Sequence, residues 1–229
     1  MSAVVTIDGP SGSGKGTVSR LLARRTAWHL LDSGALYRLV ALAGHRAGAA
    51  SDDNEAHARL AHSMQIEFAI DALGEEQVLL EGDDVSQLLR TEAAGAGASR
   101  VAAWIPVRKA LLERQRAFSR APGLIADGRD MGTVVFPHAE LKIFLTASAA
   151  ERALRRYKQL KDKDSSVTLA ALSLEIAERD RRDMTRSAAP LVPAADAIVL
   201  DSTALDAAGV TDEIYALGHS RGLWPRAKG

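Results

Sequence analysis

The sequence predicts an α/β protein in which a five-stranded parallel sheet is flanked by helices, with a small antiparallel β/α subdomain inserted and a helical lid. Three observations support this prediction. A glycine-rich sequence follows the first apolar segment, five short apolar segments alternate with helical patterns, and one hairpin-like stretch interrupts this order. Strands that alternate with helices form parallel sheets covered on both faces, whereas a hairpin pattern marks an insertion.

Length and composition limit the classes of function. The chain has 229 residues, of which 47% are hydrophobic and 25% charged, enough for one α/β domain over residues 1–229. It carries 29 basic and 29 acidic residues, so no global field draws it to nucleic acid or to an anionic membrane. It has no cysteine, which excludes disulfides and thiolate catalysis. We expect a cytoplasmic monomer that acts on small molecules.

The first half of the chain begins as a βαβ unit and then departs from it. Apolar segments predict strands at 3–7 and 28–31, and helices are expected between and after them. Asp32 and Ser33 are predicted to cap the second helix. The predicted elements are helices at 18–26, 35–48 and 53–62, and a hairpin formed by 65–70 and 77–80.

The hairpin places an inserted subdomain at 63–104, leaving a core of residues 1–62 and 105–229. Within the insertion, the alanine–glycine run 93–98 has two interpretations. Glycine widens backbone freedom and lowers helix stability, so the run is either a hinge or a poorly packed helix.

The second half returns to alternating strands and helices. Strands are expected at 124–127, 141–145 and 197–200, and helices at 106–120, 149–160, 168–184 and 205–217. In a parallel sheet, ligands bind beyond the carboxyl ends of the strands. The polar stretches at those ends should therefore lie near one another, namely 9–17, 32–33, 127–130 and 201–203.

The glycine-rich sequence at 9–17 has the spelling of a phosphate-binding loop. Glycines let backbone N–H groups turn towards an anion, and the next helix adds its positive N-terminus. Lys15 would reach the β- and γ-phosphates, and Thr17 would offer its hydroxyl to Mg²⁺. Gly16 separates these two residues, whereas the strict motif has Ser or Thr directly after the Lys, and this spelling resembles nucleotide kinases more than GTPases. The β-branched strand before the loop and the Ala/Leu/Arg-rich helix after it favour a P-loop NTPase-type fold over a plain glycine–serine turn. The predicted ATP-binding residues are Gly9, Pro10, Ser11, Gly12, Ser13, Gly14, Lys15, Gly16 and Thr17.

Several arginines fall where they can converge on a second anion. Arg38 follows the second strand, and Arg129 with Asp130 follows the third. Guanidinium groups bind phosphate with two parallel hydrogen bonds. Arg179 and Asp183, with Arg186, follow i, i+4, i+7 spacing and share one side of a helix. Surface ion pairs and a solvated charged face are the alternatives.

A basic helix precedes the polar stretch 162–166 and predicts a lid at about 152–168. Arg152, Arg155 and Arg156 could close over a triphosphate and bring positive charge to the transferred group. A solvated helix face is the equally weighted alternative.

Five stretches together resemble the bacterial cytidylate kinase family over nearly the whole chain. They are Ile7–Thr17, Leu31–Arg38, Leu80–Val85, Ile125–Thr133 and Arg179–Leu191. The chain departs from the family pattern at Gly97, where an asparagine is expected, and near Pro106, which is shifted by one position.

The resemblance implies a role for each matching residue. Lys15, Arg129 and Arg186 would be catalytic, and Arg38 would join the last two in holding the acceptor phosphate. The remaining assignments place Arg179 and Asp183 on the ribose, Ser99, Arg108 and Asp130 on the cytosine, and Ser33 and Tyr37 in the lining of the acceptor pocket.

The function predicted on this basis is transfer of the γ-phosphoryl group from ATP, with Mg²⁺, to CMP or dCMP. The products would be ADP and CDP or dCDP. Two alternatives remain open from the sequence. One is a P-loop kinase for another small acceptor, and the other is a nucleotide-binding switch that transfers no phosphoryl group.

Overall fold

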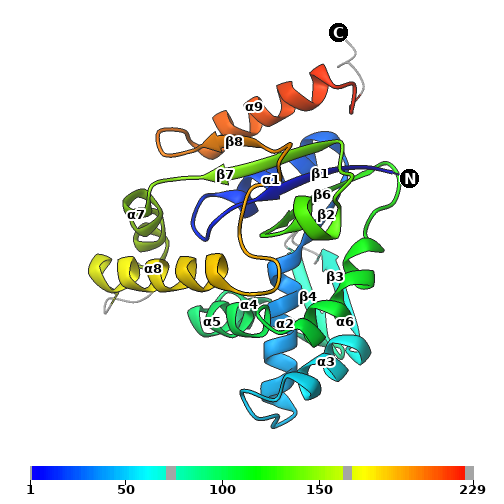
Figure 1. The fold of residues 1–229 in the computed structure, drawn as a ribbon, viewed down its shortest axis with the longest axis vertical. Coiled ribbons are helices and arrows are strands. Elements are labelled where there is room, and N and C mark those ends of the chain that lie inside the picture. The colour runs from blue at the N-terminus through cyan, green and yellow to red at the C-terminus, as the bar shows by residue number, and fades with distance from the viewer. Residues whose placement is uncertain (1, 71–75, 162–166, 225–229) are drawn as a thin grey trace. The chain divides into compact units, whose positions relative to one another are not determined.

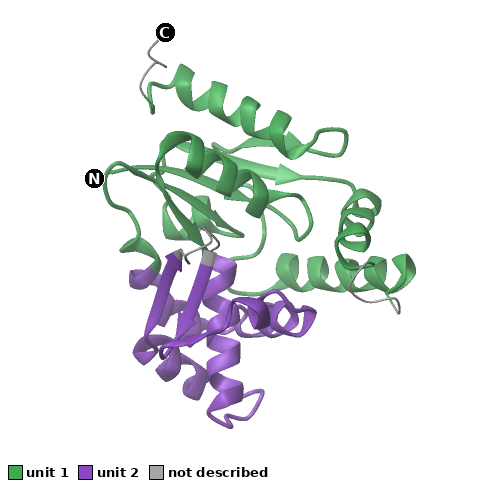
Figure 2. Cartoon of the chain, turned by 180° about the vertical axis from the view of Figure 1, so that it is seen from behind, with its two compact units in different colours: residues 1–32, 115–229 green, residues 33–114 purple. Residues whose placement is uncertain are grey.

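A computed structural model describes residues 2–70, 76–161 and 167–224. The chain divides into two compact units, which are described separately (Figure 2). The first contains residues 1–32 and 115–229, and the second contains residues 33–114. Within the described residues, no helix combines the length and the apolar character needed to span a bilayer.

The first unit is built on a five-stranded sheet in the order β2-β6-β1-β7-β8 (Figure 1). All four pairings between neighbouring strands are parallel. This confirms the predicted fold class, with strands shifted by at most a residue or two from their expected positions. The strands are β1 (Ala3–Asp8), β2 (His29–Asp32), β6 (Gly123–Gly128), β7 (Leu141–Thr146) and β8 (Ile198–Asp201).

Helices α1 (Lys15–Thr26) and α9 (Ala207–Ser220) pack against each other and share one apolar core with the sheet. Their buried residues include Val18, Leu22 and Ile214, which contact the central strands. Helices α7 (Ala149–Leu160) and α8 (Leu169–Thr185) pack together after β7. One turn of π-helix, η1 (Met131–Val135), follows β6 directly and lies against β1.

The second unit combines helices with a small antiparallel sheet in the order β3-β4-β5. The predicted hairpin is confirmed as β3 (Ile66–Ile70) and β4 (Glu76–Leu80), and β5 (Asp83–Asp84) adds a short third strand. Residues 71–75, expected to join the hairpin strands, lie outside the described residues. The helices are α2 (Ser33–Arg46), α3 (Asn54–Ser63), α4 (Ser86–Leu89), α5 (Glu92–Val101) and α6 (Ile105–Arg116), the last two residues of α6 belonging to the first unit.

The predicted insertion at 63–104 lies inside the second unit, and its role in nucleotide binding stays a prediction. The alanine–glycine run 93–98 is helical and forms the middle of α5. A Cβ atom at Gly97 would lie 2.9 Å from Ala41 Cβ, so the missing side chain lets α5 approach α2 closely. The helix is therefore well packed at this position, contrary to the poorly packed helix considered from the sequence.

Helix α6 ends at Arg116, four residues earlier than expected. The N–H groups of Phe118 and Ser119 donate to carbonyls three residues back, at 3.2 and 3.0 Å, which tightens the end of the helix into turns. Pro122 then disfavours helical geometry at the residue before it. The apolar and charged pattern of 106–120 did not reveal this ending.

Candidate active site

The phosphate loop lies at the carboxyl end of β1 and runs into α1, as predicted. Its backbone requires glycine at two positions in particular. Gly9 has φ 148°, and a Cβ atom there would lie 2.0 Å from the carbonyl oxygen of Leu145. Gly14 has φ 93° and accepts the N–H groups of Thr17 and Val18 at the start of the helix, both at 3.1 Å. The loop therefore holds a shape that other residues would strain.

Lys15 is buried and hydrogen-bonded within the loop. Its Nζ donates to the carbonyl oxygen of Pro10 at 2.6 Å and to Ser13 Oγ at 3.4 Å. The pKa of Lys15 is lowered to about 7, chiefly by burial and next by the nearby Arg129, against the opposing effect of Asp127. Removing an ammonium group from water disfavours its charged form. A bound anion would reverse this cost, as expected of a phosphate site.

Arg129 follows β6, and its Nε donates to Asp183 Oδ2 on α8 at 3.1 Å. Burial acts to raise the pKa of Asp183, but Arg129, Arg179 and Arg186 together hold it below its ordinary value. Arg179 also acts to lower the pKa of Lys15, so its charge lies within electrostatic range of that ammonium group. Three arginines from two elements therefore converge on one carboxylate in the first unit, beside the buried lysine.

Asp130 and Arg186 form a second contact between η1 and the end of α8. Asp130 is 2% exposed, and its Oδ1 lies 3.9 Å from Arg186 Nη2. Arg186 Nε also donates to the carbonyl oxygen of Ala189 at 2.6 Å, which fixes the guanidinium beside the chain that follows α8. The inward-facing charged side predicted for this helix is present, and a solvated face is not what the structure shows.

Asp8 also belongs to this site and was not among the residues predicted from the sequence. Its two carboxylate oxygens accept the N–H groups of Met131 and Gly132, each at 2.8 Å. Burial raises the pKa of Asp8 to about 7 in spite of these two hydrogen bonds. The sequence signal was a carboxylate at the end of a buried strand, where apolar residues would be expected.

The second unit holds the other predicted acceptor residues. Ser33, Tyr37 and Arg38 lie on the first turns of α2, and the first two are buried. Ser99 is buried on α5, which packs against α2. The guanidinium of Arg108 lies 5.9 Å from the centre of the Tyr37 ring, and its Nη1 donates to the carbonyl oxygen of Ala102 at 3.3 Å. The structure therefore brings Tyr37 and Arg108 near each other, while the roles of all five stay predictions.

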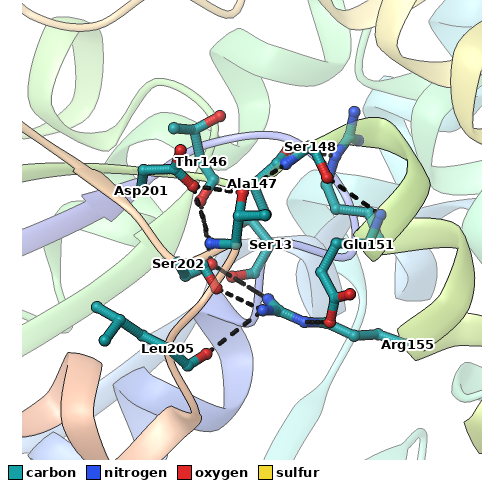
Figure 3. Close-up of polar contacts among 11 residues, drawn as sticks. Ser13, Thr146, Ala147, Ser148, Glu151, Arg155, Asp201, Ser202 and Leu205 are labelled. Carbon is teal, nitrogen blue, oxygen red and sulfur yellow. Dashed lines mark hydrogen bonds and ion pairs between the residues drawn. The ribbon is translucent and has the colours of Figure 1, made fainter.

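Two of the three predicted lid arginines contact the protein extensively in the first unit. Arg152 is buried and pairs with Asp180 on α8, with Nη2 2.6 Å from Oδ2. Arg155 bonds to Ser202, as Figure 3 shows. Arg156 Nη1 donates to Gln159 Oε1 at 3.1 Å within its own helix. Residues 162–166 of the predicted lid lie outside the described residues.

The residues at the start of α1 fit a magnesium ion bound with nucleotide phosphates. Mg²⁺ prefers oxygen ligands and usually takes one or two from the protein, with phosphate oxygens and water completing the set. Thr17 is exposed in the first turn. Asp127 Oδ2 lies 3.4 Å from the position of a Cβ atom at Gly16, so a carboxylate adjoins the same turn. Among the described residues, no group of three or more His, Cys, Asp or Glu could hold a metal by itself.

Comparisons with a family model and with curated relatives point to one family. The family model described as cytidylate kinase matches residues 5–220. A cytidylate kinase of Pseudomonas fluorescens (strain Pf0-1) is 58% identical over 94% of this chain and 95% of its own length. One from Marinomonas sp. (strain MWYL1) is 56% identical over 96% and 97%. One from Pseudomonas putida (strain W619) is 60% identical over 88% and 89%.

Proposed function

Because the chain belongs to the cytidylate kinase family, we propose that it transfers the γ-phosphoryl group of ATP to CMP or dCMP. The products are ADP and CDP or dCDP. The observation that carries this proposal is the burial of Lys15 within the phosphate loop, where Arg129 and Arg179 act on it at electrostatic range. Such a cluster is costly without an anion and suits a transferred phosphoryl group.

The donor side of the reaction is assigned to residues 9–17. The triphosphate of ATP lies against the backbone N–H groups of the loop and the N-terminus of α1. Lys15 leaves the carbonyl oxygen of Pro10 and binds the β- and γ-phosphates, which restores its ordinary protonated state. Mg²⁺, when bound, supplies charge neutralisation on the phosphates, and the Thr17 hydroxyl is the proposed ligand from the protein.

The acceptor side is assigned to the residues that match the family pattern. Arg38, Arg129 and Arg186 hold the acceptor phosphate, and Arg179 with Asp183 binds the ribose. Ser99, Arg108 and Asp130 read the cytosine, since a carboxylate accepts from its exocyclic amine while hydroxyl and guanidinium groups donate to its ring acceptors. Ser33 and Tyr37 line the pocket.

The chemistry requires positioning more than acid–base catalysis. An acceptor phosphate is already an anionic nucleophile at neutral pH, so no strong general base is needed. Lys15, Arg129 and Arg186 stabilise the charge that spreads over the equatorial oxygens of the transferred group. Placing both substrates in line supplies the remaining rate enhancement. Closure of the lid over about 152–168 excludes water and prevents hydrolysis of ATP.

A coupled assay of ADP formation tests the proposal. The full chain is given ATP and Mg²⁺ with CMP, dCMP, UMP, AMP, GMP or no acceptor. Strong stimulation by CMP and dCMP is expected, with little turnover in the absence of an acceptor. Stimulation by a different nucleotide alone would contradict the assignment of the cytosine-reading residues, and an equal rate with every acceptor and with none would contradict the kinase reaction itself.

We propose further that the enzyme acts as a monomer in the cytoplasm. The absence of cysteine suits a reducing compartment, and bacterial relatives match over nearly their whole lengths. Light scattering coupled to gel filtration should give a mass near 24.4 kDa. A mass near twice that value would contradict the monomer.

A further inference from the structure

We propose that Arg152, Arg155 and Ser202 are positioning residues that hold the phosphate loop in its anion-binding shape from outside the loop. This inference rests on the proposed function in one respect, since the anion is taken to be the triphosphate of ATP. It assigns to the two arginines a bracing role in place of the direct contact with ATP that a lid would make. The two carbonyl groups they hold belong to Ser11 and Ser13.

Arg155 and Ser202 meet at the carbonyl oxygen of Ser13 (Figure 3). Ser202 Oγ lies 3.0 Å from this oxygen, and Arg155 Nη1 lies 3.5 Å from it and 3.1 Å from Ser202 Oγ. Ser13 is fully buried and Ser202 is 2% exposed, so the contact between these two residues is shielded from water, and the Arg155 side chain is 24% exposed. A buried network of this kind is stable only when its members are mutually satisfied.

Every N–H group of the Arg155 guanidinium faces an acceptor of the protein. Nε donates to Glu151 Oε1 at 3.0 Å, and Nη1 faces the two serines already described. Nη2 donates to the carbonyl oxygen of Ser202 at 2.5 Å and faces that of Leu205 at 3.4 Å. Since a guanidinium has five N–H donors, direct contact with a phosphate would require Arg155 to give up part of this set.

Arg152 braces the loop at a second point. Its Nη1 donates to the carbonyl oxygen of Ser11 at 3.0 Å, and its Nε donates to that of Ala147 at 3.1 Å. The same guanidinium forms a two-point ion pair with Asp180, at 3.0 and 2.6 Å. Arg152 therefore joins the loop to α8, the helix that carries Arg179 and Asp183.

Peptide geometry converts these external contacts into orientation of the loop. In a trans peptide, the carbonyl group and the next N–H group point in opposite directions. Holding the carbonyls of Ser11 and Ser13 against α7 and Ser202 directs the N–H groups of Gly12 and Gly14 away from them. These N–H groups are the donors that a phosphate loop presents to its anion. A Cβ atom at Gly12 would lie only 3.0 Å from Arg152 Cβ, so the loop rests directly on this helix.

Binding measurements on the full chain separate bracing from direct contact. Inorganic tripolyphosphate and Mg-ATP are titrated into the wild type, Arg155→Met, Arg155→Lys, Ser202→Ala and the Arg155→Met/Ser202→Ala double variant. Loss of a buried hydrogen bond that orients donors should weaken binding about 10- to 100-fold for Arg155→Met and about 3- to 10-fold for Ser202→Ala. Lysine should not restore affinity, because it is a point charge without the guanidinium fork.

The double variant gives the sharpest readout. If both residues act through the Ser13 carbonyl, the double variant should bind about as weakly as Arg155→Met, because coupled residues are not additive. Additive losses, restoration of affinity by Arg155→Lys, or unchanged affinity in Ser202→Ala would each overturn the inference. Ser202→Ala also keeps the test decisive if an arginine variant fails to fold.

Arg181→Met is the matched control, since Arg181 is exposed on α8 and pairs with Glu178. It should bind both ligands within about twofold of the wild type. At saturating ATP, the KM for CMP should also be unchanged in Ser202→Ala, whereas a general loss of structure would raise it. If the wild type binds tripolyphosphate but does not phosphorylate CMP, the proposed function fails while the bracing inference stands. If it binds neither ligand, both are overturned.

Discussion

The two ends of α1 differ in their surroundings: charged side chains lie around its first turn, and packed aromatic rings lie beyond its last. At its first turn, Lys15 is buried near Arg129 and Arg179, and this region is called the charged end. Beyond its last turn, Trp28 packs edge-on against Trp224 with ring centres 5.1 Å apart, and Trp224 stacks on Tyr215 at 5.5 Å. These three rings are called the aromatic cluster.

The difference shows which part of the helix serves stability and which serves binding. In the aromatic cluster, the contacts favour the folded state: the indole N–H of Trp224 donates to the Tyr215 carbonyl oxygen at 3.0 Å, and Arg25 lies 3.8 Å from the centre of the Tyr215 ring. At the charged end, burial and neighbouring cations work against the protonated lysine. Preorganisation for an anion therefore costs stability in the unliganded protein, as is common at functional sites.

Replacing Lys15 should produce the largest effect and separate the two regions most clearly. In Lys15→Met, kcat should fall by about 10³-fold or more, because charge on the transferred phosphoryl group loses its buried partner. The midpoint of thermal unfolding without ligand should stay equal or rise, because a desolvated ammonium is removed. Steady-state kinetics and calorimetry measure the two quantities. Near-normal turnover, or a marked loss of stability, would contradict the description of the charged end.

Removing Trp224 should have the converse effect. Trp224→Ala should lower the free energy of unfolding by about 3–5 kcal/mol, through lost burial and a cavity beside Trp28. Below the unfolding transition, kcat/KM should stay within about twofold of the wild type. Urea denaturation followed by activity assays at low temperature tests both expectations.

Trp224→Phe is the matched control for that experiment, since it keeps a ring but loses the indole N–H. It should cost about 1–2 kcal/mol. Gly218→Ala probes the same contact from the facing helix, because its Cβ atom would lie 1.9 Å from the Trp224 ring. Alanine normally stabilises a helix relative to glycine. A less stable Gly218→Ala variant would therefore show that the steric contact with Trp224 outweighs helix propensity at this position.

The charged end and the aromatic cluster also differ in how far the sequence revealed them. The glycine spacing of residues 9–17 predicted the loop, and the apolar segments predicted all five strands, because both patterns are local. Helical spacing predicted that Arg179, Asp183 and Arg186 share an inward-facing side, and strand order placed Arg129 at a strand end, but the ion pair between Arg129 and Asp183 was not predicted. Asp8 was missed because its two partners, Met131 and Gly132, lie far along the chain and are backbone groups that no residue type identifies.

The lid arginines illustrate a second limit of sequence reasoning. Arg152 and Arg155 were grouped with Arg156 because all three are basic and lie on one helix. Their partners include the carbonyl oxygens of Ser11, Ser13 and Ala147, which every residue carries. The pairing of Trp28 with Trp224 was equally invisible, since the two residues meet only through the packing of α1 on α9.

Asp8→Asn should produce an intermediate effect on activity. It tests whether η1, which Asp8 holds, belongs functionally with the charged end. The amide would keep one acceptor and place an NH₂ group against the second backbone N–H, so the turn that carries Asp130 should shift. We expect kcat/KM for CMP to fall about 10- to 100-fold, with a smaller change in the KM for ATP. An equal loss for both substrates would contradict a role centred on the acceptor side.

Thr6→Val is the matched control for Asp8→Asn on the same strand. Thr6 Oγ1 is buried and has no hydrogen-bond partner among the described residues. Replacing this hydroxyl by a methyl group of similar shape should leave activity unchanged and stability equal or slightly higher. Comparable losses in both variants would indicate a general effect of altering β1.

The pH dependence of stability should give the smallest effect. Burial raises the pKa of Asp8 from 3.8 to about 7. Its stabilising contribution to the free energy of unfolding is therefore present below about pH 4 and is lost as pH rises through 7. Burial lowers the pKa of Lys15 from 10.5 to about 7, so its contribution is present above about pH 10.5 and is lost as pH falls through 7. The summed contribution of the two groups to the free energy of unfolding should therefore be smallest near pH 7 in the unliganded protein.

Comparing the wild type with Lys15→Met isolates the lysine from the carboxylate. Between pH 7 and pH 9, the wild type should gain about 1–2 kcal/mol in unfolding free energy relative to the variant, because the folded lysine is neutral while the unfolded one is still protonated. Mg-ATP should abolish this gain, since its phosphates favour the ammonium and raise the pKa of Lys15 again. A gain that persists with ATP bound would mean that the charged end is not where the triphosphate lies.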